Sequence, residues 1–367
     1  MSAPFILPPR RILIVRLSAI GDVVMASGLI PALRARWPEA EISWLTEPAT
    51  VPLLRHNPAL HEVIAWPRAE WQRLWKERRF SKLWRRVRRF RTQLRARHFD
   101  LVLDAQGLLK SGVMAWLAGA RRRVGLLSRE GSQWLMTERV GARPGDDPRM
   151  SHEYRDLADH LGAPAGSFLL ALSVGSAPRE KARSVLAAAG VPVGGAGRFA
   201  VLAPFTTRPQ KHWFEDRWVG LAASLRAEGI VPVLLGGPSD QTAGERIAAA
   251  AGPMLVNLVG QLKLDETVAA IADSALLVGV DTGLTHMGTA LSVPTVGLFG
   301  STRPYLDAGT PRTAILYEPL ACSPCRRHPT CGGAYHCMRH WTVELVMAQA
   351  RRQLAMAAQA PVEAAPA

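Results

Sequence analysis

The sequence predicts an α/β protein made of two doubly wound domains, each a mostly parallel sheet flanked by helices. Short apolar runs alternate with helical patterns, and the alternation starts afresh in the second half of the chain. A chain of 367 residues also fits two domains of ordinary size. A stretch rich in Gly, Pro and Ser at 173–197 separates the halves. We therefore place the domains at 1–175 and 176–345, followed by a C-terminal helix and a disordered Ala/Pro-rich tail at 346–367.

Each strand-like run is short, apolar and followed by a polar loop. The first half has such runs at 11–15, 41–45, 63–65 and 99–104, and a helical pattern from the loop 16–22 to about Trp37. The second half has strand-like runs at 199–203, 231–235, 254–257, 275–279 and 295–299, with helical patterns at 213–228, 242–251, 264–273 and 284–291. Parallel sheets bind ligands at the loops after their strands, so two such domains facing each other would place these loops around a central cleft.

The formal charge of +15 is concentrated in one segment. Residues 68–97 hold thirteen Lys and Arg against Glu70 and Glu77, a local balance of +11. Apolar side chains recur there mostly at three- and four-residue spacing, which predicts one amphipathic helix with a cationic face. They are Trp71, Leu74, Trp75, Phe80, Leu83, Trp84, Val87, Phe90 and Leu94.

Such a basic helix suits an anionic membrane surface or a phosphorylated substrate. Two alternatives stay open. The segment could be a solvated charged face with its Trp side chains packed inward. It could also bind nucleic acid, although no recognised nucleic-acid motif accompanies the charge.

The chain shows no uniform apolar span. Its longest stretch without a formal charge, 282–302, is interrupted by His286, Pro294 and four glycines, so it does not resemble a membrane helix. The first ten residues lack the basic and long apolar regions of a signal peptide. We expect a cytoplasmic protein.

The motif Val280-Asp-Thr-Gly-Leu-Thr-His286 follows a strand-like run and enters a helix. Gly283 permits close approach of the backbone to a ligand, and a helix N-terminus binds phosphate through its N–H groups and dipole. The Asp281 carboxylate repels phosphate, so we expect it to orient the loop. Asp and Thr are also ordinary N-caps, which leaves a purely structural role open. The chain has no G-x-G-x-x-G and no Gly-Lys-Ser/Thr, which argues against a dehydrogenase or a P-loop NTPase.

Two further loops of the second half carry polar side chains after strand-like runs. One holds Thr206, Thr207 and Lys211, where a cation could neutralise the charge on a departing nucleoside diphosphate. A solvated lysine is the alternative. The other, Gly236-Gly-Pro-Ser-Asp240, ends in a carboxylate that could accept hydrogen bonds from ribose hydroxyls, or it is a plain Gly-Pro turn.

In the first half, Asp22 follows the first strand-like run and could act as general base towards a sugar hydroxyl, or serve as a helix N-cap. The element Asp104-Ala-Gln-Gly-Leu-Leu-Lys-Ser111 places a carboxylate, an amide, a cation and a hydroxyl after another run. Gln106 and Lys110 are therefore candidates for contacts with an anionic acceptor sugar.

Five elements in this order and spacing resemble the bacterial lipopolysaccharide heptosyltransferases of glycosyltransferase family 9. They are 20–22, 104–111, 206–213, 236–238 and 280–286, and the resemblance covers roughly residues 11–345. The element 104–111 is especially similar to that of the heptosyltransferase I members. The resemblance implies a GT-B fold of two Rossmann-like domains. It also implies an inverting transfer, without a catalytic metal or cofactor, of L-glycero-D-manno-heptose from ADP-heptose to the Kdo of Kdo2-lipid A.

The resemblance also implies roles for single residues. Asp22 matches the family's proposed general base, and Lys211, with Thr206 and Thr207, matches the contacts to the leaving diphosphate. The remaining donor-binding positions are Asp240, Asp281, Thr282, Gly283, Leu284 and His286. Arg129 and Arg155 correspond to acceptor-side cations. The basic segment 68–97 would then contact the acceptor's lipid A phosphates and Kdo carboxylates at the cytoplasmic face of the inner membrane, and no nucleic acid is expected as a partner.

All four cysteines, Cys322, Cys325, Cys331 and Cys337, fall in one short segment with two, five and five residues between them. In a cytosolic protein such a set indicates a structural zinc or iron site sooner than disulfides, with His328 or His336 as substitute ligands. Some family 9 members carry a similar cluster that resembles an iron-binding finger. Two disulfides or free thiols are the alternatives.

Other functions fit parts of the same pattern. A family relative could use a different acceptor, such as a second core heptose or an autotransporter protein, or a different nucleotide sugar. A non-enzymatic alternative is a basic protein that binds anionic membranes or nucleic acid through 68–97.

Overall fold

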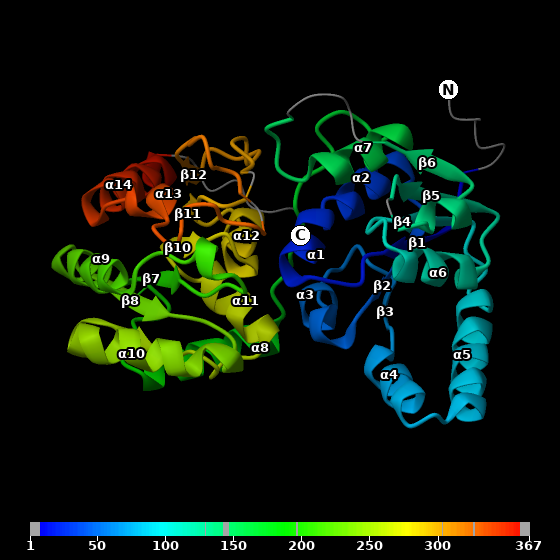
Figure 1. The fold of residues 1–367 in the computed structure, drawn as a ribbon, viewed down its shortest axis with the longest axis horizontal. Helices are drawn as coiled ribbons and strands as arrows, with labels where there is room; N and C mark the ends of the chain where they lie inside the picture. Colours follow the sequence, from blue (N-terminus) through cyan, green and yellow to red (C-terminus); the bar gives the residue numbers. More distant parts are fainter. Residues whose placement is uncertain are drawn as a thin grey trace. The chain divides into compact units, whose positions relative to one another are not determined.

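The computed structural model describes residues 8–128, 130–141, 147–195, 197–302, 304–325 and 327–359. The chain divides into two compact units (Figure 1). Unit 1 comprises 1–147 and 151–173, and unit 2 comprises 148–150 and 174–367. The disordered tail was expected from about Ala355; the chain is helical up to Gln359, and 360–367 lies outside the described residues.

Unit 1 contains a six-stranded sheet in the order β3-β2-β1-β4-β5-β6, and every neighbouring pair is parallel. Its strands are β1 (Arg11–Val15), β2 (Glu41–Thr46), β3 (Glu62–Ala65), β4 (Leu101–Asp104), β5 (Arg122–Leu126) and β6 (Glu138–Val140). Its helices are α1 (Ile20–Ala26), α2 (Leu29–Arg36), α3 (Val51–Leu54), α4 (Arg68–Lys76), α5 (Phe80–Arg95), α6 (Leu109–Ala118) and α7 (His152–His160). Helix α2 packs with α7, and α5 packs with α6, on opposite faces of the sheet (Figure 1).

Unit 2 repeats this design with the sheet order β12-β11-β10-β7-β8-β9, again parallel throughout. Its strands are β7 (Arg198–Ala203), β8 (Ile230–Leu234), β9 (Val256–Asn257), β10 (Leu276–Val280), β11 (Thr295–Phe299) and β12 (Thr313–Tyr317). Its helices are α8 (Ser176–Ala188), α9 (Glu215–Ala227), α10 (Gln241–Ala251), α11 (Leu264–Ala272), α12 (Gly283–Ala290), α13 (His336–Arg339) and α14 (Val343–Gln359). Counted within the unit, its strand order is the same as in unit 1, which is the doubly wound order.

The predicted strand-like runs all form strands, because buried apolar residues fill them. The central strands β1, β4 and β10 are almost completely buried. The prediction missed β5, β6 and β12. Strand β5 begins with two arginines, which hide its apolar end. Strand β12, Thr-Ala-Ile-Leu-Tyr, is an apolar run that the prediction overlooked.

Two helical predictions need correction. The predicted continuous helix up to Trp37 is divided into α1 and α2 at Ser27 and Gly28. At Gly28 a Cβ would stand 2.3 Å from the Phe168 ring, so only glycine allows that ring to pack there. The stretch 173–197, expected to be a changeover loop, contains the thirteen-residue helix α8, which buries Pro178, Ala182 and Leu186.

The basic segment is also not one helix. Helix α4 ends at Lys76, and α5 begins at Phe80 after a connection in which Arg78 has the positive φ of 53°. In Figure 1 this connection extends away from the sheet of unit 1. Among the described residues, no helix is long and apolar enough to cross a bilayer.

Candidate active site

Each sheet reverses its winding between two neighbouring strands, β1 and β4 in unit 1 and β7 and β10 in unit 2. The loops after the carboxyl ends of such strands form the usual ligand site of a doubly wound sheet. Asp22 and Gln106 follow β1 and β4, and Lys211 and Asp281 follow β7 and β10. The topology therefore gathers the main predicted site residues at the switch point of their own unit.

Asp22 lies in the first turn of α1, with its side chain 39% exposed. Its Oδ2 accepts the backbone N–H of Ala19 at 3.1 Å and lies 2.7 Å from Nη2 of Arg16. Asp22 is thus the third helical residue and not the N-cap. One carboxylate oxygen is tied to the protein, while the side chain stays accessible to a ligand.

Arg16, which the sequence analysis did not single out, is a buried partner of Asp22. Its Nη1 donates to the carbonyl of Ala105 at 3.1 Å, and its guanidinium lies 5.6 Å from the ring centroid of Tyr154. Burial alone would lower the pKa of Arg16, but Tyr154 and Asp22 outweigh it and raise that pKa, so the guanidinium stays charged. A charged residue directly after a buried strand was the signal available in the sequence.

Asp104 is fully buried and holds the loop after β4. Its Oδ1 accepts the N–H groups of Gln106 and Gly107, each at 3.1 Å, and Gly107 has the positive φ of 67°. Burial raises the pKa of Asp104. The Asp104 carboxylate is therefore part of the loop's framework, whereas the candidates Gln106 and Lys110 are only half-buried.

Gln106 and Lys110 connect the loops after β1, β2 and β4. The Gln106 Oε1 accepts the N–H of Leu17 at 3.0 Å. The Lys110 Nζ lies 3.4 Å from the Ser18 Oγ and 3.6 Å from Oε1 of Glu47. Gln106 also lines a cavity of about 180 Å³ together with Ser128 and Glu153. Amide, hydroxyl and carboxylate groups thus line this cavity, and Lys110 lies on the same edge of the unit 1 sheet.

The structure adds little on the two arginines that were predicted to contact the acceptor. Arg155 lies on α7 with its guanidinium 4.7 Å from the ring centroid of Phe168. Arg129 lies outside the described residues.

Asp281 is the centre of a polar network in unit 2. Its Oδ2 lies 2.5 Å from Lys211 Nζ and accepts the Thr302 hydroxyl at 2.5 Å, and its Oδ1 is 3.6 Å from His286 Nε2. Thr206 donates to the Asp281 carbonyl at 3.4 Å. Three side chains, those of Lys211, His286 and Thr302, therefore converge on one carboxylate, and Thr206 holds the backbone of the same residue. Sequence reasoning found all of them except Thr302.

The network fixes the ionisation of its members. Burial alone would raise the pKa of Asp281, but His286 and Lys211 lower it far more, so the carboxylate stays ionised. Burial raises the pKa of Tyr305, so its hydroxyl keeps its proton, 2.8 Å from His286 Nδ1. When Tyr305 donates to Nδ1, the other ring nitrogen, Nε2, carries the proton that faces Asp281.

Helix α12 begins at Gly283 with Thr282 as N-cap, directly against the sheet. A Cβ at Gly279 would stand 2.3 Å from Thr285 Oγ1 and 3.0 Å from the Ala203 Cβ. The Thr285 hydroxyl itself donates to the Val280 carbonyl at 2.6 Å. Glycine in β10 therefore allows the N-terminus of α12, with the N–H groups of Gly283 and Leu284, to sit at the switch point.

The two remaining residues predicted to bind the donor, Thr207 and Asp240, differ in their surroundings. Thr207 is exposed on the loop after β7, which also carries Lys211. Asp240 accepts the Gly237 N–H at 2.8 Å and so caps its own short turn, Pro238–Asp240. One oxygen of Asp240 is thus committed to the turn.

The four cysteines are free thiols, and those of Cys325 and Cys337 lie within electrostatic reach of the others. Burial raises the pKa of both thiols, and the neighbouring cysteines raise it further. In the described part of the chain, however, no three Cys, His, Asp or Glu side chains are arranged to hold a metal ion. The donor set suits zinc or iron, but the side chains are not in ligand positions.

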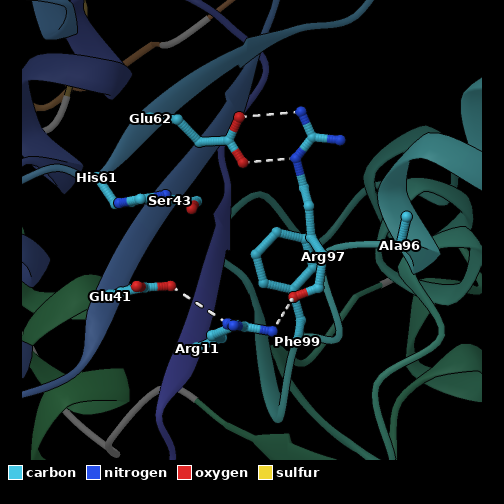
Figure 2. Close-up of a pocket in the computed structure, with 8 residues that line it drawn as sticks. All are labelled: Arg11, Glu41, Ser43, His61, Glu62, Ala96, Arg97 and Phe99. Carbon is cyan, nitrogen blue, oxygen red and sulfur yellow. Dashed lines mark hydrogen bonds and ion pairs between the residues drawn. The ribbon is translucent and has the colours of Figure 1, made fainter.

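A cavity of about 290 Å³ lies at the opposite edge of the unit 1 sheet, where the strands begin (Figure 2). Two ion pairs face it, Arg97 with Glu62 and Arg11 with Glu41. Its charges are neutralised internally, and it is remote from the switch point. We do not assign it to the active site.

The two doubly wound sheets, with an accessible carboxylate at one switch point and a lysine and helix N-terminus at the other, define a GT-B glycosyltransferase. The fold agrees with that of the Escherichia coli heptosyltransferase WaaC solved with ADP-2-deoxy-2-fluoro heptose, at a TM-score of 0.69 and 24% identity, covering 93% of this chain and 99% of that one.

The sequence comparisons give the family. The model of glycosyltransferase family 9 (heptosyltransferase) matches residues 87–336, and the chain belongs to this family. It is 30% identical over 320 residues to lipopolysaccharide heptosyltransferase 1 of Pseudomonas aeruginosa, covering 86% of both chains. It is 29% identical over 313 residues to lipopolysaccharide heptosyltransferase 2 of Escherichia coli, covering 80% of this chain and 84% of that one. The predicted family and fold are confirmed, and the chain is an enzyme.

Proposed function

We propose that this enzyme transfers L-glycero-D-manno-heptose from ADP-heptose to the Kdo residue of Kdo2-lipid A, with inversion at the anomeric carbon. The observation that carries the proposal is Asp22, an accessible carboxylate with one oxygen tied down at the switch point of unit 1. The similarity to a heptosyltransferase 1 supports the choice of donor and acceptor.

On the acceptor side, the Asp22 carboxylate takes the proton of the attacking hydroxyl as its oxygen bonds to the anomeric carbon. Arg16 and the Ala19 N–H hold Oδ2, so the carboxylate keeps its orientation while it acts as base. Gln106 and Lys110 contact the Kdo residue, and Lys110 supplies positive charge for its carboxylate.

On the donor side, the bond between the anomeric carbon and the diphosphate oxygen breaks, and ADP leaves with added negative charge. Lys211 has one ammonium N–H directed to Asp281 and two further donors for the diphosphate. The α12 N-terminus adds N–H groups and a favourable dipole. Asp281 serves by orienting Lys211 and His286. It does not contact phosphate itself.

The enzyme works at the cytoplasmic face of the inner membrane, where a lipid-linked acceptor is presented. Support comes from the cationic segment 68–97, whose charge is opposite to that of lipid phosphates.

We further propose that the segment 322–337 binds one structural zinc or iron ion, with no part in the reaction. Four clustered free thiols support this, and they would have to close around the ion. Elemental analysis of the untagged protein tests it. We expect about one metal per chain, lost when Cys322, Cys325, Cys331 and Cys337 are replaced by Ser. Metal-free purified protein would contradict it.

The reaction is tested by incubating the protein with ADP-heptose and Kdo2-lipid A and measuring the mass of the product by mass spectrometry. We expect Asp22→Asn to lower kcat by roughly 10²–10⁴ while donor binding is retained. The control is Asp216→Asn, the same change at an exposed position in the first turn of α9. An active Asp22→Asn enzyme would refute the assignment of the base.

The similarity to a heptosyltransferase 2 makes a heptose-bearing core the second candidate acceptor. The two candidate acceptors are distinguished by testing acceptors with zero and one heptose, each with ADP-heptose and with other nucleotide sugars. Transfer only to the heptose-bearing acceptor would reassign the acceptor and leave the donor side unchanged.

A further inference from the structure

We propose that the connection between α4 and α5 anchors the enzyme in an anionic bilayer through three aromatic side chains. Trp75 and Phe80 flank the connection, and Trp84 lies one turn further along α5. They are 65%, 51% and 60% exposed. Trp75 and Phe80 pack edge to face with their ring centroids 5.2 Å apart. We call Trp75, Phe80 and Trp84 the aromatic tip.

The aromatic tip is distinct from the aromatic residues that hold the two helices to unit 1. Trp71 packs edge to face on Trp66 and Phe90, with ring centroids 5.9 and 5.5 Å apart. Phe90 and Leu94 are buried in the core of the unit. The helices are thus already anchored from inside, so the exposure of the aromatic tip serves no internal packing.

The surroundings of the aromatic tip carry the charge that a bilayer of anionic lipids attracts. On α5, Arg85, Arg88 and Arg89 follow Trp84 closely and are exposed. The Arg88 guanidinium lies 5.2 Å from the Trp84 ring centroid. Among the described residues, no carboxylate pairs with Arg85, Arg88 or Arg89.

Aromatic side chains beside unpaired arginines are typical of segments that lie in the bilayer interface. There, Trp rings occupy the headgroup region and each cation near the surface adds to the attraction. Nucleic acid fits less well, because single strands are held by bases stacked on open ring faces. Here the edge of one ring of the Trp75–Phe80 pair meets the face of the other, and the Arg88 guanidinium lies over one face of Trp84.

This inference refines the proposed membrane contact, but its test does not need heptosyl transfer. The full chain is sedimented with vesicles of phosphatidylcholine, with and without phosphatidylglycerol. We expect binding only to the anionic vesicles, weakening with salt. The triple variant Trp75→Ser, Phe80→Ser, Trp84→Ser should bind about tenfold more weakly or worse. The affinity of the variant Arg85→Ser, Arg88→Ser, Arg89→Ser for anionic vesicles should fall on the order of a hundredfold.

The control removes exposed apolar side chains elsewhere, with Leu345→Ser and Met356→Ser on α14 of unit 2, and should bind as the unchanged protein does. Far-ultraviolet circular dichroism and the thermal midpoint verify folding, and the single variant Trp84→Ser repeats the test with the smallest change. Full vesicle binding by the aromatic-tip variants would overturn the proposal, as would binding to a single-stranded oligonucleotide but not to vesicles.

Transfer to a deacylated, water-soluble acceptor separates this proposal from the proposed reaction. The aromatic-tip variant should keep that activity and lose transfer to acceptor embedded in vesicles. An unchanged protein that binds vesicles but transfers nothing would refute the reaction alone.

Discussion

The Arg16 guanidinium lies 2.7 Å from Oδ2 of Asp22 and is itself buried at the end of β1. A buried arginine needs a partner, and Arg16 has the half-exposed Asp22, the Ala105 carbonyl and the face of Tyr154. Asp104, the buried carboxylate after β4, feels the same positive charge. Arg16 therefore links the proposed base to the framework of the acceptor-side loops.

Arg16 is a positioning residue, and its replacement should impair the reaction through Asp22. We expect Arg16→Gln to lower kcat on the order of a hundredfold with little change in the dissociation constant of ADP-heptose, because the donor-side groups lie in unit 2. Arg16→Lys, which keeps one donor and the charge, should restore part of the loss. Steady-state kinetics measure kcat, and calorimetry measures the dissociation constant of ADP-heptose. If Lys and Gln variants lose kcat equally, Arg16 only supports the fold.

Breaking the network around Asp281 should destabilise unit 2 and weaken donor binding together. Lys211 and Asp281 are 16% and 14% exposed, so Asp281→Asn leaves a buried ammonium without its counter-charge, at a cost of about 3–5 kcal/mol. Denaturant unfolding and ADP-heptose titration measure both effects. A variant with unchanged stability and affinity would show that the pair is dispensable.

The same carboxylate predicts a pH dependence. Its pKa is lowered in the folded state, so its contribution to stability is present above the unfolded value of about 3.8 and is lost as the pH falls below that value towards the folded pKa. Acid unfolding of the unchanged protein should therefore steepen below about pH 4. In Asp281→Asn that component should be absent. Identical acid slopes in the two proteins would contradict the assignment.

Much of the fold could be predicted because buried parallel strands have a recognisable sequence pattern. The runs that became β1, β4, β7 and β10 are short, apolar and followed by polar loops. The break between α4 and α5 has no such pattern, because Arg78 adopts its positive φ in a segment without Gly or Pro. Periodicity also could not distinguish Trp71, which is packed, from Trp75, which is exposed, because burial depends on the rest of unit 1.

The candidate site was predicted from polar residues at the junctions between apolar runs and the helices that follow them. Asp22, Lys211 and Asp281 lie at such junctions. Thr302 and Tyr305 follow β11 and reach Asp281 and His286 only through the adjacency of β10 and β11, which the sequence does not state. Arg16 also directly follows an apolar run, but its position in the sequence did not reveal its burial, which depends on Tyr154 of α7, far along the chain.

Removing the Tyr305 hydroxyl should loosen His286 without unfolding the unit. In Tyr305→Phe the ring stays packed against Phe299, while Nδ1 of His286 loses its hydrogen-bond partner. We expect a stability loss of about 1 kcal/mol and weaker binding of ADP-heptose. His286→Ala should then cost little more in the Tyr305→Phe background than Tyr305→Phe costs alone, which a double-mutant cycle measures. Fully additive effects would mean that the two residues act separately.

The position of α12 depends on the absence of a side chain at Gly279, and this gives the most selective test of the donor site. In Gly279→Ala the new methyl group would lie 2.3 Å from Thr285 Oγ1, a contact that forces the helix off β10. We expect ADP-heptose affinity to fall at least about tenfold and stability to drop by about 1–3 kcal/mol. The matched control is Gly141→Ala, where a Cβ meets nothing within 4 Å, and it should change neither quantity. If Gly279→Ala binds ADP-heptose normally, the N-terminus of α12 does not hold the donor.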